Sequence, residues 1–277
     1  MELEFFKMSG AGNDFIVINN MDGRLPESGR ESLFADWCRR GMSIGADGVL
    51  VLEPSARAHF RMRYYNADGR EAETCGNGSR CIARFAHVME VAPASMRFET
   101  MAGEYEARVE GETVVVGLSD AHGLREGIAI AEPEFTGTVH FVNTGVPHAV
   151  VLCGGVDVAE RIAALDVVRM GRCLRYHREF APAGANANFI EVTGPQAIAI
   201  RTYERGVENE TLACGTGSVA ACIIAARRGL VTTPVSVRTA GGDTLTVDFE
   251  PSPGGARGVK LGGPARIVFR GYVPWPE

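Results

Sequence analysis

The chain has 277 residues, of which 45% are hydrophobic and 22% are charged, and its formal net charge is -6. This composition is typical of a globular protein with one large or two smaller domains. The acidic balance, without a run of lysine or arginine, argues against nucleic acid and anionic membrane surfaces as partners.

Alternating and apolar segments predict many strands and a few helices. In the first half, strands are expected at 1–6, 15–19, 49–52, 60–65, 96–100, 104–110 and 113–118, and helices at 28–40 and 79–90. In the second half, strands are expected at 139–142, 149–152, 188–192, 197–203, 235–239, 244–249 and 265–269, and helices at 158–165 and 218–228. A domain boundary is expected at 118–124, and a loop rich in Pro and Gly at 251–258.

The seven cysteines are an odd number. The start of the chain, MELEFFKMSGAGNDF, does not have the pattern of a secretory signal. The most apolar segment of the whole chain, residues 219–226, is too short to span a bilayer. We therefore expect a cytoplasmic protein without a disulfide framework. No CxxC and no His/Cys cluster with zinc spacing occurs, so no metal is expected. Five cysteines lie among apolar neighbours and are expected to fill the core: Cys38, Cys81, Cys153, Cys173 and Cys222.

An internal repeat is the most informative feature of the chain. Around Cys75 the sequence reads RMRYYNADGREAETCGNGSRCIARFA, and around Cys214 it reads AIRTYERGVENETLACGTGSVAACIIAA. Both copies have a strand with a tyrosine, a polar turn, Cys-Gly-x-Gly-Ser and an apolar helical pattern. A weaker repeat relates GAGNDFIVIN to TGVPHAVVL. The prediction is an α/β (α+β) fold of two pseudo-symmetric domains, each a curved mixed sheet around a central helix. The expected domains are 1–118 plus 264–277, and 119–263.

A Cys-Gly-x-Gly turn at the start of a helix can activate a thiol. Free backbone N–H groups and the helix dipole stabilise negative charge there, on a thiolate or on a bound carboxylate. If the two domains face each other, both sulfurs meet in one cleft. One thiolate can then remove a Cα proton next to a carboxylate, and the opposing thiol can return a proton to the other face. Such a cysteine pair predicts an amino-acid epimerase.

The lysine content argues against a pyridoxal phosphate enzyme. Only Lys7 and Lys260 are present, among 28 basic residues, and neither has a context that suggests a Schiff base. The two amide-lined turns replace part of what such an electron sink supplies. No cofactor is therefore expected.

At these motifs the chain resembles the diaminopimelate epimerases. The resemblance runs nearly from end to end, through KMSGAGNDF, GADGV, YNADGREAETCGNGSRC, FVNTGVPHAV, GANANFIEV, YERGVENETLACGTGS and GGDTLTV. It implies an isomerase that interconverts LL- and meso-diaminopimelate, for lysine and cell-wall precursor synthesis. It also implies a homodimer, and a last strand that returns to the first domain.

The resemblance also implies the site residues. Cys75 and Cys214 correspond to the catalytic pair, and His148 and Glu204 to the residues that tune them. The substrate contacts are Asn13, Asn66, Gly76, Asn77, Asn186, Glu204, Arg205, Gly215 and Thr216. The chain departs from the common family pattern at Val146, where many members have asparagine, and near Gly48, where many have glutamine. Asp14, Asp47 and Asp68 are expected to be structural.

Two other functions fit the cysteines. A proline or hydroxyproline racemase would also use two opposed thiols, but proline has no second carboxylate for Arg205 to bind. A redox or metal-binding thiol protein would titrate with oxidant or metal and show no turnover. The absence of CxxC and of clustered ligands argues against it.

Overall fold

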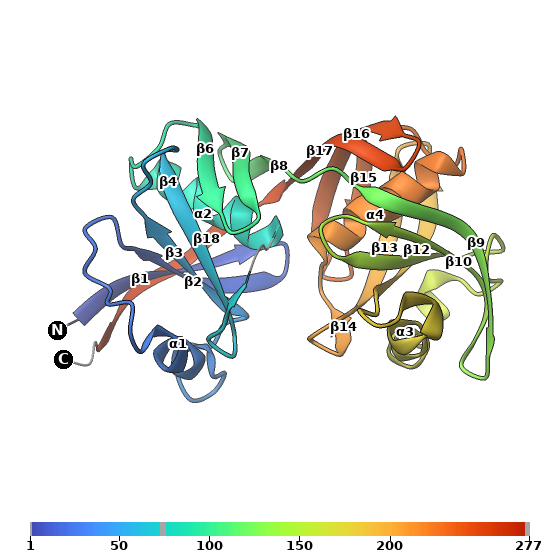
Figure 1. The fold of residues 1–277 in the computed structure, drawn as a ribbon, viewed down its shortest axis with the longest axis horizontal. Coiled ribbons are helices and arrows are strands. Elements are labelled where there is room, and N and C mark those ends of the chain that lie inside the picture. Colours follow the sequence, from blue (N-terminus) through green and yellow to red (C-terminus); the bar gives the residue numbers. More distant parts are fainter. Residues whose placement is uncertain (1, 73–75, 275–277) are drawn as a thin grey trace. The chain divides into compact units, whose positions relative to one another are not determined.

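The computed structural model describes residues 2–72 and 76–274, and the chain divides into two compact units (Figure 1). Unit 1 comprises Met1–Gly117 and Gly263–Glu277, and unit 2 comprises Leu118–Gly262. Each unit is a mixed sheet that packs around a helix, so the fold class predicted from the repeat is confirmed.

Unit 1 is built on a sheet in which the strands pair in the order β18–β1–β2–β3–β4–β6–β7–β8. The short strand β5 pairs with the end of β4. Helix α1 (Arg30–Cys38) connects β2 to β3, and α2 (Gly76–Val88) precedes β6. The strands are β1 (Glu2–Gly10), β2 (Asn13–Asn19), β3 (Gly48–Glu53), β4 (Phe60–Asn66), β5 (Glu71–Ala72), β6 (Ser95–Thr100), β7 (Gly103–Glu110), β8 (Thr113–Gly117) and β18 (Arg266–Pro274).

Unit 2 has the same order, β9–β10–β11–β12–β13–β15–β16–β17, with β14 beside the end of β13. Helix α3 (Val167–Tyr176) lies between β11 and β12 in sequence, and α4 (Gly215–Arg227) precedes β15. Two 3-10 turns, η1 (Ile162–Ala164) and η2 (Arg178–Phe180), flank α3. The strands are β9 (His122–Glu132), β10 (Phe135–Asn143), β11 (Pro147–Leu152), β12 (Asn186–Gly194), β13 (Ala197–Glu204), β14 (Asn209–Thr211), β15 (Val235–Arg238), β16 (Thr244–Ser252) and β17 (Gly255–Pro264).

The repeat in the sequence is a repeat in topology. The parallel pairs β2–β3 and β4–β6 of unit 1 correspond to β11–β12 and β13–β15 of unit 2, and the other neighbours in each order are antiparallel. The last strand, β18, runs beside β1, where β9 runs beside β10. Strand β18 therefore completes the sheet of unit 1.

The helix after each cysteine motif is the centre of its unit. In α4 every residue from Gly217 to Ala225 is buried, and α2 buries a continuous run from Gly76 to Ala83. A helix that is apolar all round needs partners on every side. Helix α4 contacts β10, β11, β12, β13 and β16, and α2 contacts β1, β2, β3, β4, β7 and β8. The prediction of two buried central helices is confirmed.

The predicted helix at 158–165 is wrong. Glycines at 154 and 155 have positive φ, and the chain turns there with only the short η1. The real helix is α3, whose N-cap Asp166 accepts a hydrogen bond from the Arg169 backbone. Its buried positions, Val167, Gly171 and Leu174, have helical spacing, but arginines between them hid the pattern.

Four strands also lie where the sequence predicted none: the short strands β5 and β14, and the longer strands β9 and β17. Strand β9 begins inside the expected boundary at 118–124, and β17 begins inside the expected loop at 251–258. Strand β9 lies at the edge of the unit 2 sheet and is mostly exposed, so it lacks the apolar alternation of a buried strand. Between β16 and β17 the chain reverses tightly, with Ser252 opposite Gly255.

The five cysteines that were expected in the core lie in the core or pack against it. Cys38, Cys81, Cys153 and Cys222 are buried, and Cys173 is half-buried against the core of unit 2. Burial raises the pKa of Cys38 to about 11 and that of Cys153 to about 12. No helix within the described residues has the length and apolar character needed to cross a membrane.

Candidate active site

Cys214 is the N-cap residue of α4. Its backbone is extended, with φ -123° and ψ 111°, and its carbonyl accepts hydrogen bonds of 2.9 Å from both the backbone and the hydroxyl of Ser218. The side chain is only 6% exposed. The N–H groups of the first turn have no partner within the helix, so this end can stabilise an anion. The thiol therefore lies where a thiolate is favoured.

Gly217 lets a polar side chain reach the cysteine. A Cβ at this position would lie 2.3 Å from Asn188 Oδ1 and 3.1 Å from Cys214 Sγ. Both atoms therefore crowd the same side of the first turn of α4. The second glycine of the motif is required for this close packing.

His148 is connected to this cluster through Asn188. The imidazole is fully buried on β11, and its Nδ1 accepts a hydrogen bond of 3.1 Å from Asn188 Nδ2. Burial, with a further contribution from the charge of Arg205, lowers the pKa of His148 to about 3, although the bond from Asn188 opposes this shift. The ring is therefore neutral near pH 7, and it carries its proton on Nε2. Within residues 2–72 and 76–274, this Nε2 has no hydrogen-bond partner.

Thr216 and Asn186 connect the residues around Cys214 and His148 to neighbouring segments of unit 2. The Thr144 hydroxyl donates a hydrogen bond of 3.0 Å to the Thr216 carbonyl, and Thr216 Oγ1 lies 3.7 Å from Cys214 Sγ. Asn186 donates to the Pro147 carbonyl at 3.2 Å and accepts from the Arg205 backbone N–H at 2.7 Å. Asn186 thus joins the segment before His148 to the turn after β13.

That turn carries Glu204 and Arg205. Glu204 is the last residue of β13, and its Oε2 accepts a hydrogen bond of 2.9 Å from the Thr211 hydroxyl on β14. Arg205 donates through Nη1 to the Ala183 carbonyl at 3.1 Å. Unit 2 therefore gathers Cys214, Gly215, Thr216, His148, Asn186, Glu204 and Arg205 around the start of α4 and the turn after β13.

In unit 1, the second predicted cysteine, Cys75, lies outside the described residues. Helix α2 starts at Gly76, directly after it, as α4 starts directly after Cys214. Asn77 is buried in the first turn of α2, and its Nδ2 donates a hydrogen bond of 2.5 Å to Asn13 Oδ1. Two predicted substrate contacts that are 64 residues apart are thus brought together.

The amides of Asn77 and Asn13 are oriented from both ends. The fully buried Arg80 donates to Asn77 Oδ1 at 2.8 Å, and Asn13 donates to Asp47 Oδ2 at 3.0 Å. Each amide therefore has a defined orientation and keeps a second N–H for another acceptor. The structural interpretation of Asp47 agrees with this contact, and Asp14 forms ion pairs with Lys7 and Arg40.

Two predicted positions are less enclosed. Asn66 is exposed at the end of β4, where its carbonyl accepts from the Gly69 N–H at 2.9 Å. Gly48 starts β3, and a Cβ there would lie 2.4 Å from the Tyr65 carbonyl oxygen and 2.7 Å from the ring of Tyr64. This departure from the family pattern therefore fits the packing of β3 against β4.

Sequence reasoning missed Asn188, Thr144 and Arg80. Asn188 and Thr144 lie within the motifs GANANFIEV and FVNTGVPHAV, but nothing in either motif shows that they bond His148 and Thr216.

Among the described residues, no three His, Cys, Asp or Glu side chains gather in a way that could hold a metal ion. An open hollow of about 590 Å³ beside α3 contains none of the site residues.

The same fold occurs in solved structures of low sequence identity. A phenazine biosynthesis protein of the PhzF family from Bacillus anthracis has a TM-score of 0.73 at 16% identity, over 99% of this chain and 100% of that chain. A probable proline racemase from Agrobacterium radiobacter also has a TM-score of 0.73 at 16% identity, over 99% of this chain and 93% of that one. Identity this low shows the shared fold alone.

The sequence comparisons define the family. The profile described as diaminopimelate epimerase matches residues 5–122 and 140–259. The diaminopimelate epimerase of Chlorobaculum tepidum is 44% identical over 96% of this chain and 99% of that protein. The enzyme of the same name from Aquifex aeolicus is 39% identical over 98% of both chains. The chain belongs to the diaminopimelate epimerase family.

Proposed function

We propose that this chain interconverts LL- and meso-diaminopimelate without pyridoxal phosphate, with Cys75 and Cys214 as its acid and base. Membership of the diaminopimelate epimerase family supports the proposed substrate. The observation that carries the mechanism is the duplicated helix start, where Cys214 caps α4 and Cys75 directly precedes α2. The reaction serves the synthesis of lysine and of cell-wall precursors.

The proposed mechanism needs the two helix starts to face one cleft between the units. One thiolate removes the Cα proton, and the thiol on the opposite face donates a proton, which inverts the centre. The N–H groups of Gly76 and Asn77, with those of Gly215 and Thr216, bind the adjacent carboxylate and stabilise the charge that develops on it. The two thiols exchange roles in the reverse direction, so their titration belongs to the pair.

The polar residues around the helix starts suit a substrate with a second amino-acid end. Asn13 and Asn66 come from unit 1, and Asn186 and Arg205 from unit 2. We assign them to the distal carboxylate and amine. A guanidinium and oriented amides are good partners for a carboxylate.

We assign His148 and Glu204 to the tuning of the thiols. His148 is neutral and offers Nε2–H from a buried ring, so it can donate to a thiolate but adds no positive charge. Glu204, held by Thr211, offers an acceptor to a substrate amine or to a thiol proton.

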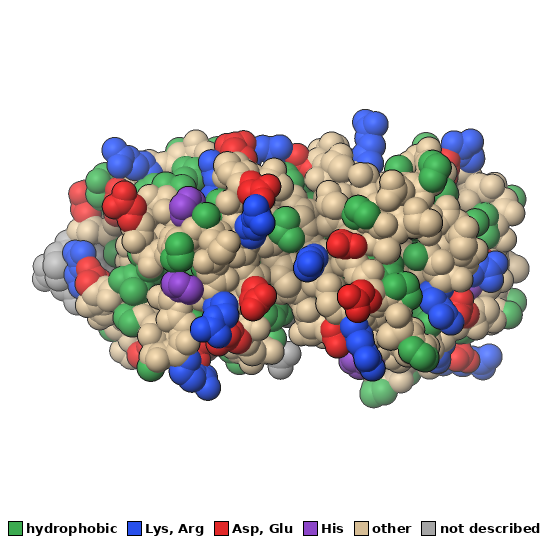
Figure 2. Space-filling model, turned by 90° about the horizontal axis from the view of Figure 1, so that it is seen from above, with side chains coloured by type: hydrophobic (Ala, Val, Ile, Leu, Met, Phe, Trp, Pro, Cys, Tyr) green, Lys and Arg blue, Asp and Glu red, His purple; other side chains and the backbone are tan. Residues whose placement is uncertain are grey.

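We also propose that the protein is a cytoplasmic homodimer. The proposed chemistry needs reduced thiols, which fits a reducing compartment. Strand β18 is an edge strand whose Val268 and Tyr272 are 60% and 63% exposed on one face. A second copy of this strand is a fitting cover for that edge. On the face drawn in Figure 2, acidic and basic side chains of the described residues are interspersed, which suits neither a nucleic acid nor a membrane surface.

The proposed activity is tested by incubating the reduced protein with LL-diaminopimelate in heavy water, with no cofactor added. Formation of the meso isomer with one deuterium at an α-carbon is the expected result. Exchange with proline and none with diaminopimelate would instead favour the sister racemase, whose fold this chain shares at 16% identity. Thiol oxidation or metal uptake without any exchange would favour the binding protein.

A further inference from the structure

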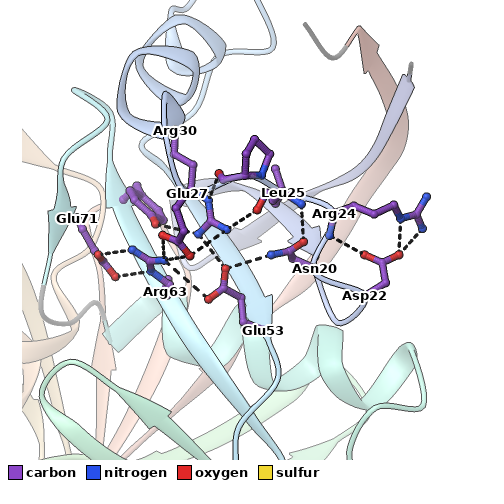
Figure 3. A network of polar contacts seen from close by, with 11 residues as sticks. Asn20, Asp22, Arg24, Leu25, Glu27, Arg30, Glu53, Arg63 and Glu71 are labelled. Carbon is purple, nitrogen blue, oxygen red and sulfur yellow. Dashed lines mark hydrogen bonds and ion pairs between the residues drawn. The ribbon is translucent and has the colours of Figure 1, made fainter. Parts of the chain in front are cut away.

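Each cysteine motif is preceded by a hairpin that carries a paired arginine and glutamate. On β4 and β5, Arg63 Nε lies 2.8 Å from Glu71 Oε1, and Nη2 lies 2.7 Å from Oε2 (Figure 3). On β13 and β14, Arg201 and Glu210 form the same two bonds, both 2.7 Å long. Both pairs use the parallel, two-bond geometry that gives an arginine–carboxylate contact its directional strength. We call these two pairs the hairpin clamps.

The clamps occupy equivalent places in the two units. In unit 1, Tyr65 is opposite Glu71, and in unit 2, Tyr203 is opposite Glu210. In both hairpins the arginine is two residues before that tyrosine, so it reaches the glutamate along the same diagonal of the sheet. In both, the glutamate stands four residues before the cysteine. The geometry is present in both copies of the repeat, which indicates a function that belongs to the motif.

The clamps occur where the backbone gives little support. Within the residues that the structure describes, β5 pairs with β4 through two residues, and β14 pairs with β13 through three. The hairpin β6–β7, by comparison, pairs through six residues. A strand this short has few ladder hydrogen bonds to fix its register. The side-chain pair therefore supplies much of what holds β5 and β14 in place.

Each clamp also anchors its hairpin to the element that packs beside it. Arg63 Nη1 donates to both carboxylate oxygens of Glu27, 2.9 and 2.7 Å away, in the segment before α1. Arg201 Nη1 donates to the carbonyls of Ile162 and Leu165, 3.0 and 3.1 Å away, at η1. Both guanidinium groups are largely shielded, with side chains 15% and 27% exposed. The hairpin is thus fixed to the body of its unit on two sides.

We propose that Arg63–Glu71 and Arg201–Glu210 are positioning pairs, which fix the hairpins that precede α2 and α4 in the sequence and thereby set the position from which the thiol of each motif acts. This inference rests on the proposed function, in which those thiols are the acid and the base. In each motif the glutamate of the hairpin precedes the cysteine by four positions in the sequence. A shift of the hairpin is therefore passed to the thiol, and a displacement of 1 Å at a reacting group can cost about 10²-fold in rate.

The test compares Arg63→Gln and Arg201→Gln with the control Arg97→Gln. Arg97 forms an ion pair with Glu104 on the β6–β7 hairpin, and that pair is more exposed, at 56% and 40%. Two measurements are made on the reduced full chain. The first is the pH dependence of iodoacetamide alkylation at Cys75 and at Cys214, resolved by peptide mass spectrometry. The second is kcat and KM with LL-diaminopimelate.

We expect each clamp variant to affect its own cysteine. In Arg201→Gln, Cys214 alkylates more slowly near neutral pH and its profile moves to higher pH, because the thiolate loses the helix start. Cys75 keeps the wild-type profile in this variant, and Arg63→Gln gives the converse result. In both, kcat falls by about tenfold or more with a small change in KM. Arg97→Gln resembles the wild type in every measurement.

The milder variants Glu71→Gln and Glu210→Gln keep one hydrogen bond and serve if an arginine variant does not fold. Wild-type alkylation profiles and kcat in folded clamp variants would overturn the proposal. Equal changes at both cysteines in each variant would overturn it too, since they would report a general loss of stability. If the wild type itself does not epimerise diaminopimelate, the proposed function fails, while the alkylation profiles still decide whether the clamps position the thiols.

Discussion

Asn188 fixes the tautomer of His148. Asn188 Nδ2 lies 3.1 Å from His148 Nδ1 and 3.0 Å from the Ala149 carbonyl oxygen, while Asn188 Oδ1 accepts from the Thr202 hydroxyl at 3.0 Å. Reversing the amide would place two oxygens against each other at Ala149. The orientation is therefore set, and because an amide nitrogen only donates, Nδ1 must accept. The ring keeps its proton on Nε2.

Replacing Asn188 by leucine should release this tautomer. Without the donor, His148 can place its proton on either nitrogen, and the ring loses its only bond to Nδ1 among the described residues. We expect kcat to fall by about 10²-fold, as for a misplaced catalytic group. The check is ¹⁵N NMR of histidine-labelled protein, where the wild type should show a protonated Nε2 and an unprotonated Nδ1. A protonated Nδ1 in the wild type would contradict the assignment.

His148 should also make the fold sensitive to acid. The folded pKa, lowered to about 3, lies below the ordinary value of 6.5, so between these limits unfolding takes up a proton. This contribution to stability is complete above pH 6.5 and is lost as the pH falls toward 3. Its slope approaches about 1.4 kcal/mol per pH unit in that window. Urea unfolding from pH 6.5 to 4.5 measures it.

The control for this pH dependence is a comparison of two variants. His148→Gln should flatten the slope of unfolding free energy against pH, whereas His122→Gln, at an exposed position on β9, should leave it unchanged. Equal slopes in the wild type and in His148→Gln would mean that the buried imidazole is not the group that titrates.

Gly217→Ala tests the close packing at the start of α4. The added methyl group would meet Asn188 Oδ1 at 2.3 Å and Cys214 Sγ at 3.1 Å, so one of them must move. We expect a loss of about 1–3 kcal/mol in stability, as for an overpacked core, and a fall in kcat. Gly254→Ala is the control, because a Cβ there meets no atom within 4 Å. Thermal unfolding and turnover of both variants check the prediction, and an unchanged Gly217→Ala enzyme would refute it.

The central helices could be predicted from the sequence, because α4 is apolar on every side and α2 nearly so. The duplicated fold could also be predicted, because the repeat is visible within short stretches of sequence around the two cysteine motifs. By contrast, the His148–Asn188 bond joins side chains 40 residues apart on the parallel strands β11 and β12. The register of two strands decides that contact, and no local pattern reports the register. The clamps are similar, since only the pairing of β4 with β5 brings Arg63 to Glu71.

Strand β9 was missed for a different reason. Its hydrogen bonds to β10 define it, and most of its side chains remain in solvent, so no apolar face is needed. Strand β18 also lies at the edge of its sheet. Its apolar residues give the sequence pattern of a strand that is buried on both faces, although several of them are exposed. A sequence pattern reports burial, and a strand at the edge of a sheet is not always buried.

Val268→Lys tests the proposed dimer. Val268 and Tyr272 lie on one face of β18, and a lysine in that row opposes self-pairing by charge repulsion and by the cost of burying an ammonium group. We expect the wild type to sediment as a dimer and the variant as a monomer with the wild-type circular dichroism spectrum. Val207→Lys, at another exposed valine in unit 2, should remain dimeric. A monomeric wild type, or a dimer that Val268→Lys leaves intact, would exclude this edge.

Cys214→Ala and Cys75→Ala test the two-base mechanism most directly. Each variant lacks the group that exchanges a proton on one face, and general acid–base catalysis contributes about 10²–10⁴-fold, so kcat should fall by at least that range. Cys173→Ala is the matched control, because Cys173 is a thiol within α3 and outside both Cys-Gly-x-Gly motifs. Formation of meso-diaminopimelate at pH 7.5 and thermal unfolding are measured for all three. Both catalytic variants should fold like the wild type, since the Cys214 side chain forms no capping hydrogen bond to α4 that alanine would remove. Full turnover in either one would exclude the cysteine pair, because a single thiol cannot act on both faces of the same carbon at once.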